Sequence, residues 1–206
     1  MSKTRLEAFS DGVIAIIITI MVLELHAPHG ADWSALRPVI PSLLAYVLSF
    51  VFLGIYWNNH HHLLQATERI NGVTLWANLH LLFWLSLIPF VTSWMGENHY
   101  QSAPTAVYGF VMLMCAVAFT ILIRTILAAQ HGLNSRLAAA MGHDRKGKLS
   151  LLIYAVAVPL AFLHPAITDV LLVVVALIWF IPDSRIEARL EGAPERDRGA
   201  EVRSRG

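Results

Sequence analysis

The sequence predicts an all-α integral membrane protein, folded as a bundle of six membrane-spanning helices. Of its 206 residues, 56% are hydrophobic and only 14% are charged, and the mean hydropathy is +0.59. Soluble domains carry about 25% charged residues. The hydrophobic residues also gather in long blocks, and a block of about 20 residues crosses a bilayer as a helix. These two observations exclude an ordinary soluble domain, and the distribution of basic residues, a third observation, indicates how many helices cross.

Six hydrophobic segments predict the six helices. They run from about residue 9 to 25, 39 to 57, 75 to 94, 106 to 123, 149 to 163 and 166 to 181. The last two are short, and the His164-Pro165 step between them is typical of a tight turn, so we expect a hairpin. The first segment contains Ser10 and Asp11 and lacks a convincing cleavage site. We therefore interpret it as a retained span and not as a signal peptide.

The basic residues indicate how the helices are oriented. Cytoplasmic loops are enriched in Lys and Arg. With six spans, 14 of the 15 Lys and Arg residues fall on one side and only Arg37 falls on the other. This split predicts that both termini are cytoplasmic. Residues 1–185 then form one six-span domain, and residues 186–206 form a charged cytoplasmic tail of disordered composition.

Polar residues of the first span lie near its cytoplasmic end. The six-span topology brings Asp11 to the level of Arg5, of residues 60–62 at the end of the second span, and of Asn78 in the third. Ionisable groups inside a membrane are costly and mark functional candidates. One interpretation is a buried hydrogen-bonded cluster that fixes the angle of the first span. The other is that Ser10 and Asp11 cap the helix start, where a carboxylate suits the positive end of the helix dipole.

Other chemistries find little support. Consecutive helical residues point about 100° apart, so His60, His61 and His62 do not converge on one metal ion. Cys115 is the single cysteine and forms no internal disulfide. The sequence holds no hydrolase, metalloprotease or nucleotide-binding motif. We therefore expect neither an enzyme, nor a bound metal or cofactor, nor a nucleic-acid partner.

The first span carries an apolar stripe on one helix face. Ile16, Ile20 and Leu23 follow i, i+4, i+7 spacing, Gly12 shares their stripe, and Thr19 lies one step to the side. The pattern alone leaves open whether this stripe faces lipid, protein or a water-filled axis, and a packing face is the usual outcome. No conventional potassium-selective loop is present. A pore would therefore need a hydrophobic constriction, which can gate by losing its water.

The first span also carries a family signature. The stretch RLEAFSDG at residues 5–12, followed by AIIIT at residues 15–19, resembles the R-x-x-x-F-S-D signature of the transmembrane protein 175 family, lysosomal potassium channels with prokaryotic homologues. The WNNHH run at residues 57–61 and residues 78–90 are also similar to that family. The resemblance covers roughly residues 3 to 185.

The resemblance implies a potassium-permeable cation channel of the bacterial cell membrane. Animal members carry two six-span repeats per chain and dimerise, so the single repeat of this chain implies a homotetramer in the lipid bilayer. The first span of each subunit would line the central axis. Potassium and other monovalent cations would be the permeant ions.

The family's pore residues can be placed on this chain. Ile16, seven residues after the motif phenylalanine, matches the constriction isoleucine, and Ile20 and Leu23 match the next apolar layers. Thr19 matches a threonine associated with potassium selectivity. Glu24 would place four carboxylates around the outer mouth if it faces the axis, where they would concentrate cations. Alternatively, its side chain snorkels to the membrane interface.

The polar motif residues are implied to support the first span and not to bind ions. The residues of this supporting network are Arg5, Phe9, Ser10, Asp11, His60, His61 and Asn78. Two other functions compete with the channel: a secondary transporter or proton-coupled carrier that uses Asp11 and the histidines, and a non-conducting membrane scaffold.

Overall fold

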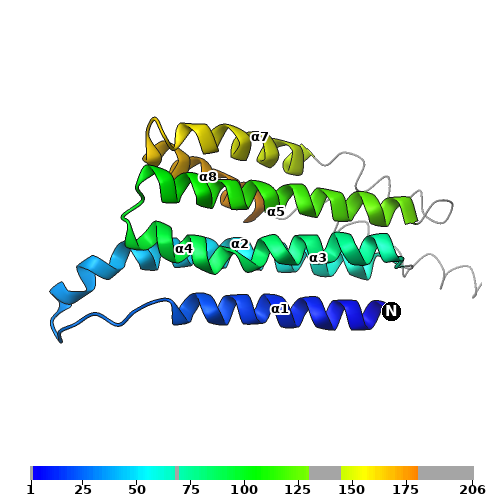
Figure 1. Cartoon of the computed structure of the whole chain (residues 1–206), viewed down its shortest axis with the longest axis horizontal. Helices are drawn as coiled ribbons and strands as arrows, with labels where there is room; N and C mark the ends of the chain where they lie inside the picture. Colours follow the sequence, from blue (N-terminus) through cyan, green and yellow to red (C-terminus); the bar gives the residue numbers. More distant parts are fainter. Residues whose placement is uncertain (1, 68–69, 130–144, 181–206) are drawn as a thin grey trace, which may run out of the picture.

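The fold is described from a computed structural model of the whole chain, in which residues 2–67, 70–129 and 145–180 are placed. These residues form long helices joined by short connections (Figure 1). The predicted tail at residues 186–206 lies outside the described residues. The helices are α1 (Lys3–Leu23), η1 (Trp33–Val39), α2 (Ile40–Gln65), α3 (Gly72–Ser86), α4 (Ile88–Glu97), α5 (Ser102–Ala129), α7 (Arg145–Leu160) and α8 (Pro165–Phe180).

Four helical stretches within the described part of the chain are long and apolar enough to cross a membrane: α1, η1 with α2, α3 with α4, and α5. The apolar helix α8 is shorter. This confirms an all-helical protein built from membrane-length helices. The α7–α8 hairpin lies at the turn predicted around His164-Pro165.

The third hydrophobic segment, expected as one helix, is two helices in the structure. α3 ends at Ser86 and α4 begins at Ile88, with Pro89 in its first turn. Proline has no N–H and its ring crowds the carbonyl four residues earlier. The Leu87 N–H bonds instead to the carbonyl of Trp84, over 3.2 Å. The chain therefore passes from α3 to α4 without a loop but with a break in the helical ladder.

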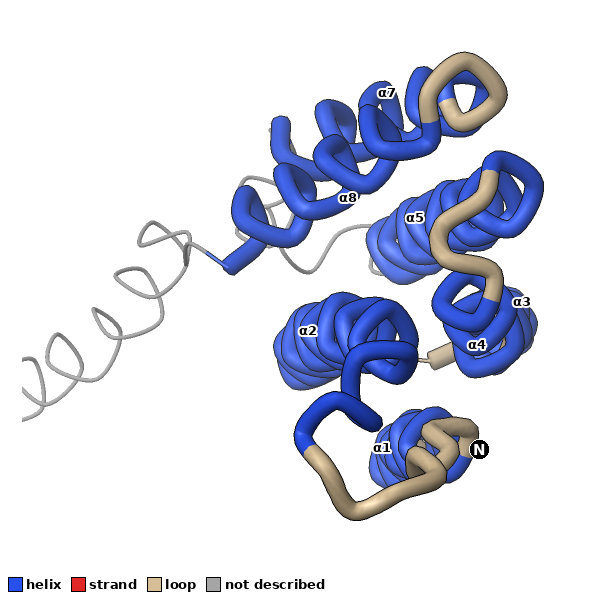
Figure 2. Tube along the Cα trace, turned by 90° about the vertical axis from the view of Figure 1, so that its left-hand side faces the viewer, coloured by secondary structure: helices blue, strands red, loops and turns tan. Residues whose placement is uncertain are grey.

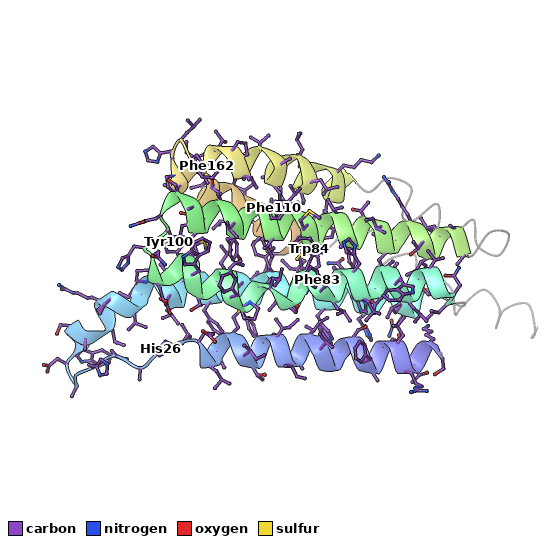
Figure 3. The ribbon with its side chains drawn as sticks, in the orientation of Figure 1. His26, Phe83, Trp84, Tyr100, Phe110 and Phe162 are labelled. Atoms are coloured by element: carbon purple, nitrogen blue, oxygen red, sulfur yellow. The ribbon has the colours of Figure 1, made fainter. Side chains whose placement is uncertain are left out.

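The helices form a layered bundle with α1 on one side. Viewed along the helices, α1 lies against α2 and against the α3–α4 pair, α5 lies in the middle, and α7 and α8 lie on the far side (Figure 2). Aromatic side chains fill part of the α3–α5 interface, where Trp84 packs edge-to-face on Phe83 and Phe110 (Figure 3). Because only one side of α1 is covered, its opposite side is free in the single chain.

A close contact sets the distance between α2 and α4. A Cβ atom added to Gly96 would lie 2.6 Å from the Cα atom of Ser42. No side chain fits there without a backbone shift, so glycine lets the two helices approach.

The turn between α4 and α5 is also tied to α2. His99 and Tyr100 have positive φ angles of 49° and 57°, a backbone conformation that residues other than glycine rarely adopt. The Tyr100 hydroxyl donates to the Pro41 carbonyl over 2.9 Å. Burial raises the pKa of Tyr100 from its ordinary value of 10.0 to about 12, which extends the pH range over which this hydroxyl stays protonated and can donate.

Candidate functional site

The candidate site is α1, whose two faces differ in burial. Its buried side chains are Leu6, Ser10, Ile14, Ile17 and Met21. They recur every three or four residues and so form one face of the helix. This face packs on α2, α3 and α4.

The opposite face of α1 carries the predicted pore residues. Ile16 is 58% exposed, Ile20 is 42% exposed and Leu23 is 77% exposed. Thr19 is also exposed, and its hydroxyl donates to the Ile16 carbonyl over 2.8 Å. The structure therefore places all four side chains on the uncovered side of α1, so they do not pack into the core of their own chain. Sequence periodicity alone had made a packing face the usual expectation.

Three buried polar residues join α1, α2 and α3 near the N-terminal end of the bundle. The Asn78 amide nitrogen donates to the Ser10 hydroxyl over 2.9 Å. The Asn78 amide oxygen accepts from Nε2 of His60 over 2.7 Å. All three residues are at most 1% exposed. A buried polar group without a partner is costly, so this chain of bonds favours one arrangement of the three helices.

Asp11 belongs to a second group of contacts, separate from His60. Its Oδ1 atom accepts from Nε1 of Trp57 over 3.0 Å. The Trp57 ring stacks on His61, with ring centres 5.9 Å apart. Nε2 of His61 in turn accepts from the side-chain amide of Gln65 over 2.8 Å. Sequence reasoning placed Asp11 at the right membrane level but missed Trp57 as its partner.

The remaining predicted support residues lie toward the surface. Arg5 is exposed and Phe9 is 48% exposed. Among residues placed by the structure, the Arg5 side chain has no hydrogen-bond or ion-pair partner. Lys3, which the motif does not include, donates to the Gln65 carbonyl over 2.8 Å. This contact ties the start of α1 to the last turn of α2, where exposed carbonyls favour a cation.

A further polar network went unnoticed in the sequence. The Ser49 hydroxyl lies 2.7 Å from the Thr92 hydroxyl and 2.9 Å from the Tyr108 hydroxyl, and all three are buried. It links α2, α4 and α5. Single hydroxyls are common in membrane helices because they can bond to their own backbone, so nothing in their spacing pointed to this contact.

Metal binding has no support in the part of the chain that is placed. No group of three or more His, Cys, Asp or Glu side chains there is arranged to hold a metal ion. Of the consecutive histidines, His60 is buried on Asn78, His61 is half-buried on Trp57 and His62 is exposed. The rings of His61 and His62 lie edge-to-face with their centres 5.7 Å apart, whereas His60 bonds separately to Asn78.

Comparison with known proteins points to one family. Residues 5–89 match the family model described as endosomal/lysosomal potassium channel TMEM175. A potassium channel of Chryseobacterium sp. is 51% identical over 191 residues, which are 93% of this chain and 99% of that protein. The endosomal/lysosomal proton channel TMEM175 of Gallus gallus is 33% identical over 58% of this chain, which spans only 26% of that longer protein.

A solved structure agrees with the sequence matches. The crystal structure of a lysosomal potassium-selective channel TMEM175 homologue from Chamaesiphon minutus superposes with a TM-score of 0.72. It is 26% identical in sequence, and the match covers 87% of this chain and 96% of the other. The similarity therefore extends well beyond α1 to most of the helical bundle.

Proposed function

Because this chain belongs to the endosomal/lysosomal potassium channel TMEM175 family, we propose that four copies form a potassium-permeable cation channel with α1 lining its central axis. One observation carries the proposal. The stripe of Ile16, Thr19, Ile20 and Leu23 is uncovered in the single chain, on the helix that holds the family signature. Fourfold assembly around this stripe would line a narrow passage with these side chains.

The constriction would be apolar. A ring of four Ile16 side chains offers no oxygen to replace the water around a cation. A hydrated ion would pass only when the ring widens or stays wet, as in other hydrophobic gates. Ile20 and Leu23 would form further apolar layers, and Thr19 would supply the polar atoms nearest the neck. Its hydroxyl bonds to its own helix backbone, which leaves an oxygen lone pair for the passage.

The polar residues of α1 would have a supporting function. Ser10 and Asp11 bond to Asn78 on α3 and to Trp57 on α2. Both contacts hold α1 against its own chain, and neither points to ion coordination. This arrangement also weakens the carrier hypothesis, because Asp11 has an indole partner and no histidine hydrogen-bonds to it among the residues placed.

The channel would lie in the cell membrane with the N-terminal end of the bundle in the cytoplasm. The asymmetry of Lys and Arg supports this orientation. Glu24, which follows the last residue of α1, is exposed and would then lie at the outer end. There its carboxylate would contribute to a negative field that attracts cations.

Ion flux through purified protein in liposomes tests the proposal. We expect a potassium current with discrete unitary steps, and a detergent-solubilised mass near four chains. Saturable flux that requires a second, coupled ion would identify a carrier instead, and no flux would identify a scaffold. Because vertebrate relatives are named proton channels, the same vesicles should carry a pH-sensitive dye to compare proton with potassium flux. A stable monomer would refute the pore.

A further inference from the structure

The end of the bundle opposite the N-terminus, here called the distal end, carries unbalanced charge. Exposed carboxylates lie at Glu24, Asp32 and Glu97. Arg37 is the one Lys or Arg in the connections at this end, at residues 24–39, 98–101 and 161–164. Among the placed residues, no ion pair joins Arg37 to any of these acids. Among the described residues, each of these charges therefore lacks an ion-pair partner.

Two of these carboxylates stand at the end of an apolar groove between α1 and α4. The groove has a volume of about 570 Å³ and is walled by Ile16 and Ile20 on one side and by Phe90 and Trp94 on the other. Phe90 and Trp94 stack with ring centres 6.1 Å apart. The distal end of the groove is formed by Glu24 and Glu97, which also line a second hollow of about 610 Å³ under the α1–η1 connection. Arg37 lines neither hollow.

Arg37 is an exposed residue of η1, the short helix between α1 and α2. Figure 2 shows the α1–η1 connection and the short helix η1 passing beside α2. Ser34, Ala35 and Pro38 of η1 line the second hollow with Glu24 and Glu97, whereas Arg37 does not. Arg37 is exposed, Trp33 is 88% exposed and Leu36 is 43% exposed. The surface of η1 therefore combines one positive charge with apolar side chains, which complements a groove that combines apolar walls with two negative charges.

We propose that Arg37 of one copy pairs with Glu24 and Glu97 of the neighbouring copy, with η1 covering the distal end of the neighbour's α1–α4 groove. The proposal rests on the homotetramer of the proposed function. Contact between two different surfaces of one chain is head-to-tail, and such contacts close into rings when the rotation permits. A guanidinium presents a planar fork of donors that suits carboxylate oxygens. The pair would fix the distal end of α1, beside Leu23, in each subunit.

Charge favours a second copy of the chain over a lipid as the molecule that covers the distal end of the groove. A lipid tail would suit the groove walls, but a phosphate headgroup would meet two carboxylates at the distal end. Arg37 in turn is anchored on a helix at that level. In a ring, every copy supplies one arginine and one acidic groove end, so all four pairs form together.

Cross-linking tests the contact directly. Because Cys115 is the single cysteine, the substitutions Arg37→Cys and Glu97→Cys are made in separate chains carrying Cys115→Ala and different affinity tags. We expect a short bis-maleimide to join the two kinds of chain when they are co-expressed. The matched control replaces Glu97→Cys with His99→Cys, which is exposed two residues away but lines neither hollow. The proposal would be overturned if the Arg37→Cys and Glu97→Cys chains did not cross-link, or if they cross-linked no more than the Arg37→Cys and His99→Cys control chains.

Charge reversal tests the energy of the contact. Arg37→Glu would place three carboxylates together, and like charges across an interface cost several kcal/mol. We expect at least about a tenfold rise in the protein concentration at which half of the tetramer dissociates, since each 1.4 kcal/mol is about tenfold. Adding Glu97→Arg to Arg37→Glu should restore the wild-type value.

The outcomes separate this contact from the channel itself. An unchanged tetramer in Arg37→Glu, or a weakened one that Glu97→Arg fails to restore, would overturn the pairing while leaving potassium flux and the channel in place. A wild-type protein that is monomeric and carries no flux would instead refute the proposed function.

Discussion

The side-chain amide of Asn78 donates to the Ser10 hydroxyl over 2.9 Å at a point where both residues are completely buried. The other end of the same amide accepts from His60. One residue of α3 therefore satisfies polar groups of both α1 and α2. This amide therefore joins α1 and α2 to α3 on the buried face of α1, away from the exposed stripe.

Replacing Asn78 should destabilise the protein. Asn78→Leu keeps the approximate size but leaves the Ser10 hydroxyl and the His60 ring without a partner, and each orphaned group costs about 1–3 kcal/mol. We expect a clear fall in the melting temperature, measured by tryptophan fluorescence of the detergent-solubilised protein. Asn58→Leu, at an exposed position of α2, is the control. Equal melting temperatures for the two variants would show that the network adds nothing to stability.

Replacing Trp57 should have a smaller effect. Trp57→Phe retains a ring that can stack on His61 but removes the donor to Asp11, at a position that is half-exposed. We expect a loss of about 1 kcal/mol in the same assay. Trp76→Phe removes an indole that is 75% exposed and serves as control. If Trp57→Phe matched this control, the Asp11 contact would be irrelevant to the folded state.

Two glycines should respond to alanine in opposite ways. Gly96→Ala places a methyl group 2.6 Å from the Ser42 backbone, so α2 and α4 must separate, and overpacking costs about 1–3 kcal/mol. Gly54→Ala meets nothing within 4 Å inside α2 and should gain roughly 0.5–1 kcal/mol from helix propensity. Thermal unfolding of both variants measures the difference, and a Gly96→Ala protein as stable as Gly54→Ala would contradict the close helix contact.

Opening the proposed constriction should raise ion flux. Ile16→Asn replaces a ring of apolar side chains by amides that can hydrate, and a barrier lower by only about 1.4 kcal/mol raises the rate about tenfold. The rate of potassium flux from proteoliposomes measures the effect of the substitution. The control is Val170→Asn, at a position of α8 that is 62% exposed and far along the chain from α1. The same flux in both variants would remove Ile16 from the constriction.

Some of this was predictable from local sequence. The i, i+4, i+7 spacing put Ile16, Ile20 and Leu23 on one face, and helical geometry alone keeps them there. Topology also predicted that Asp11, His60 and Asn78 lie at one level, because short loops fix which helix ends meet. The partner of Asp11 was missed because a tryptophan near the end of a membrane helix is expected to anchor the helix at the interface, which does not predict a bond to a carboxylate.

The sequence by itself determined the class of the protein and the content of each helix. Long apolar blocks require helices in a bilayer, where every backbone group must be bonded within its own segment. Only the tertiary structure decided that α3 and α4 are separate, that Gly96 meets Ser42, and that the face of α1 with Ile16 is the uncovered one. These features depend on how helices far apart in sequence pack, and helix periodicity places side chains on a face without saying what that face meets.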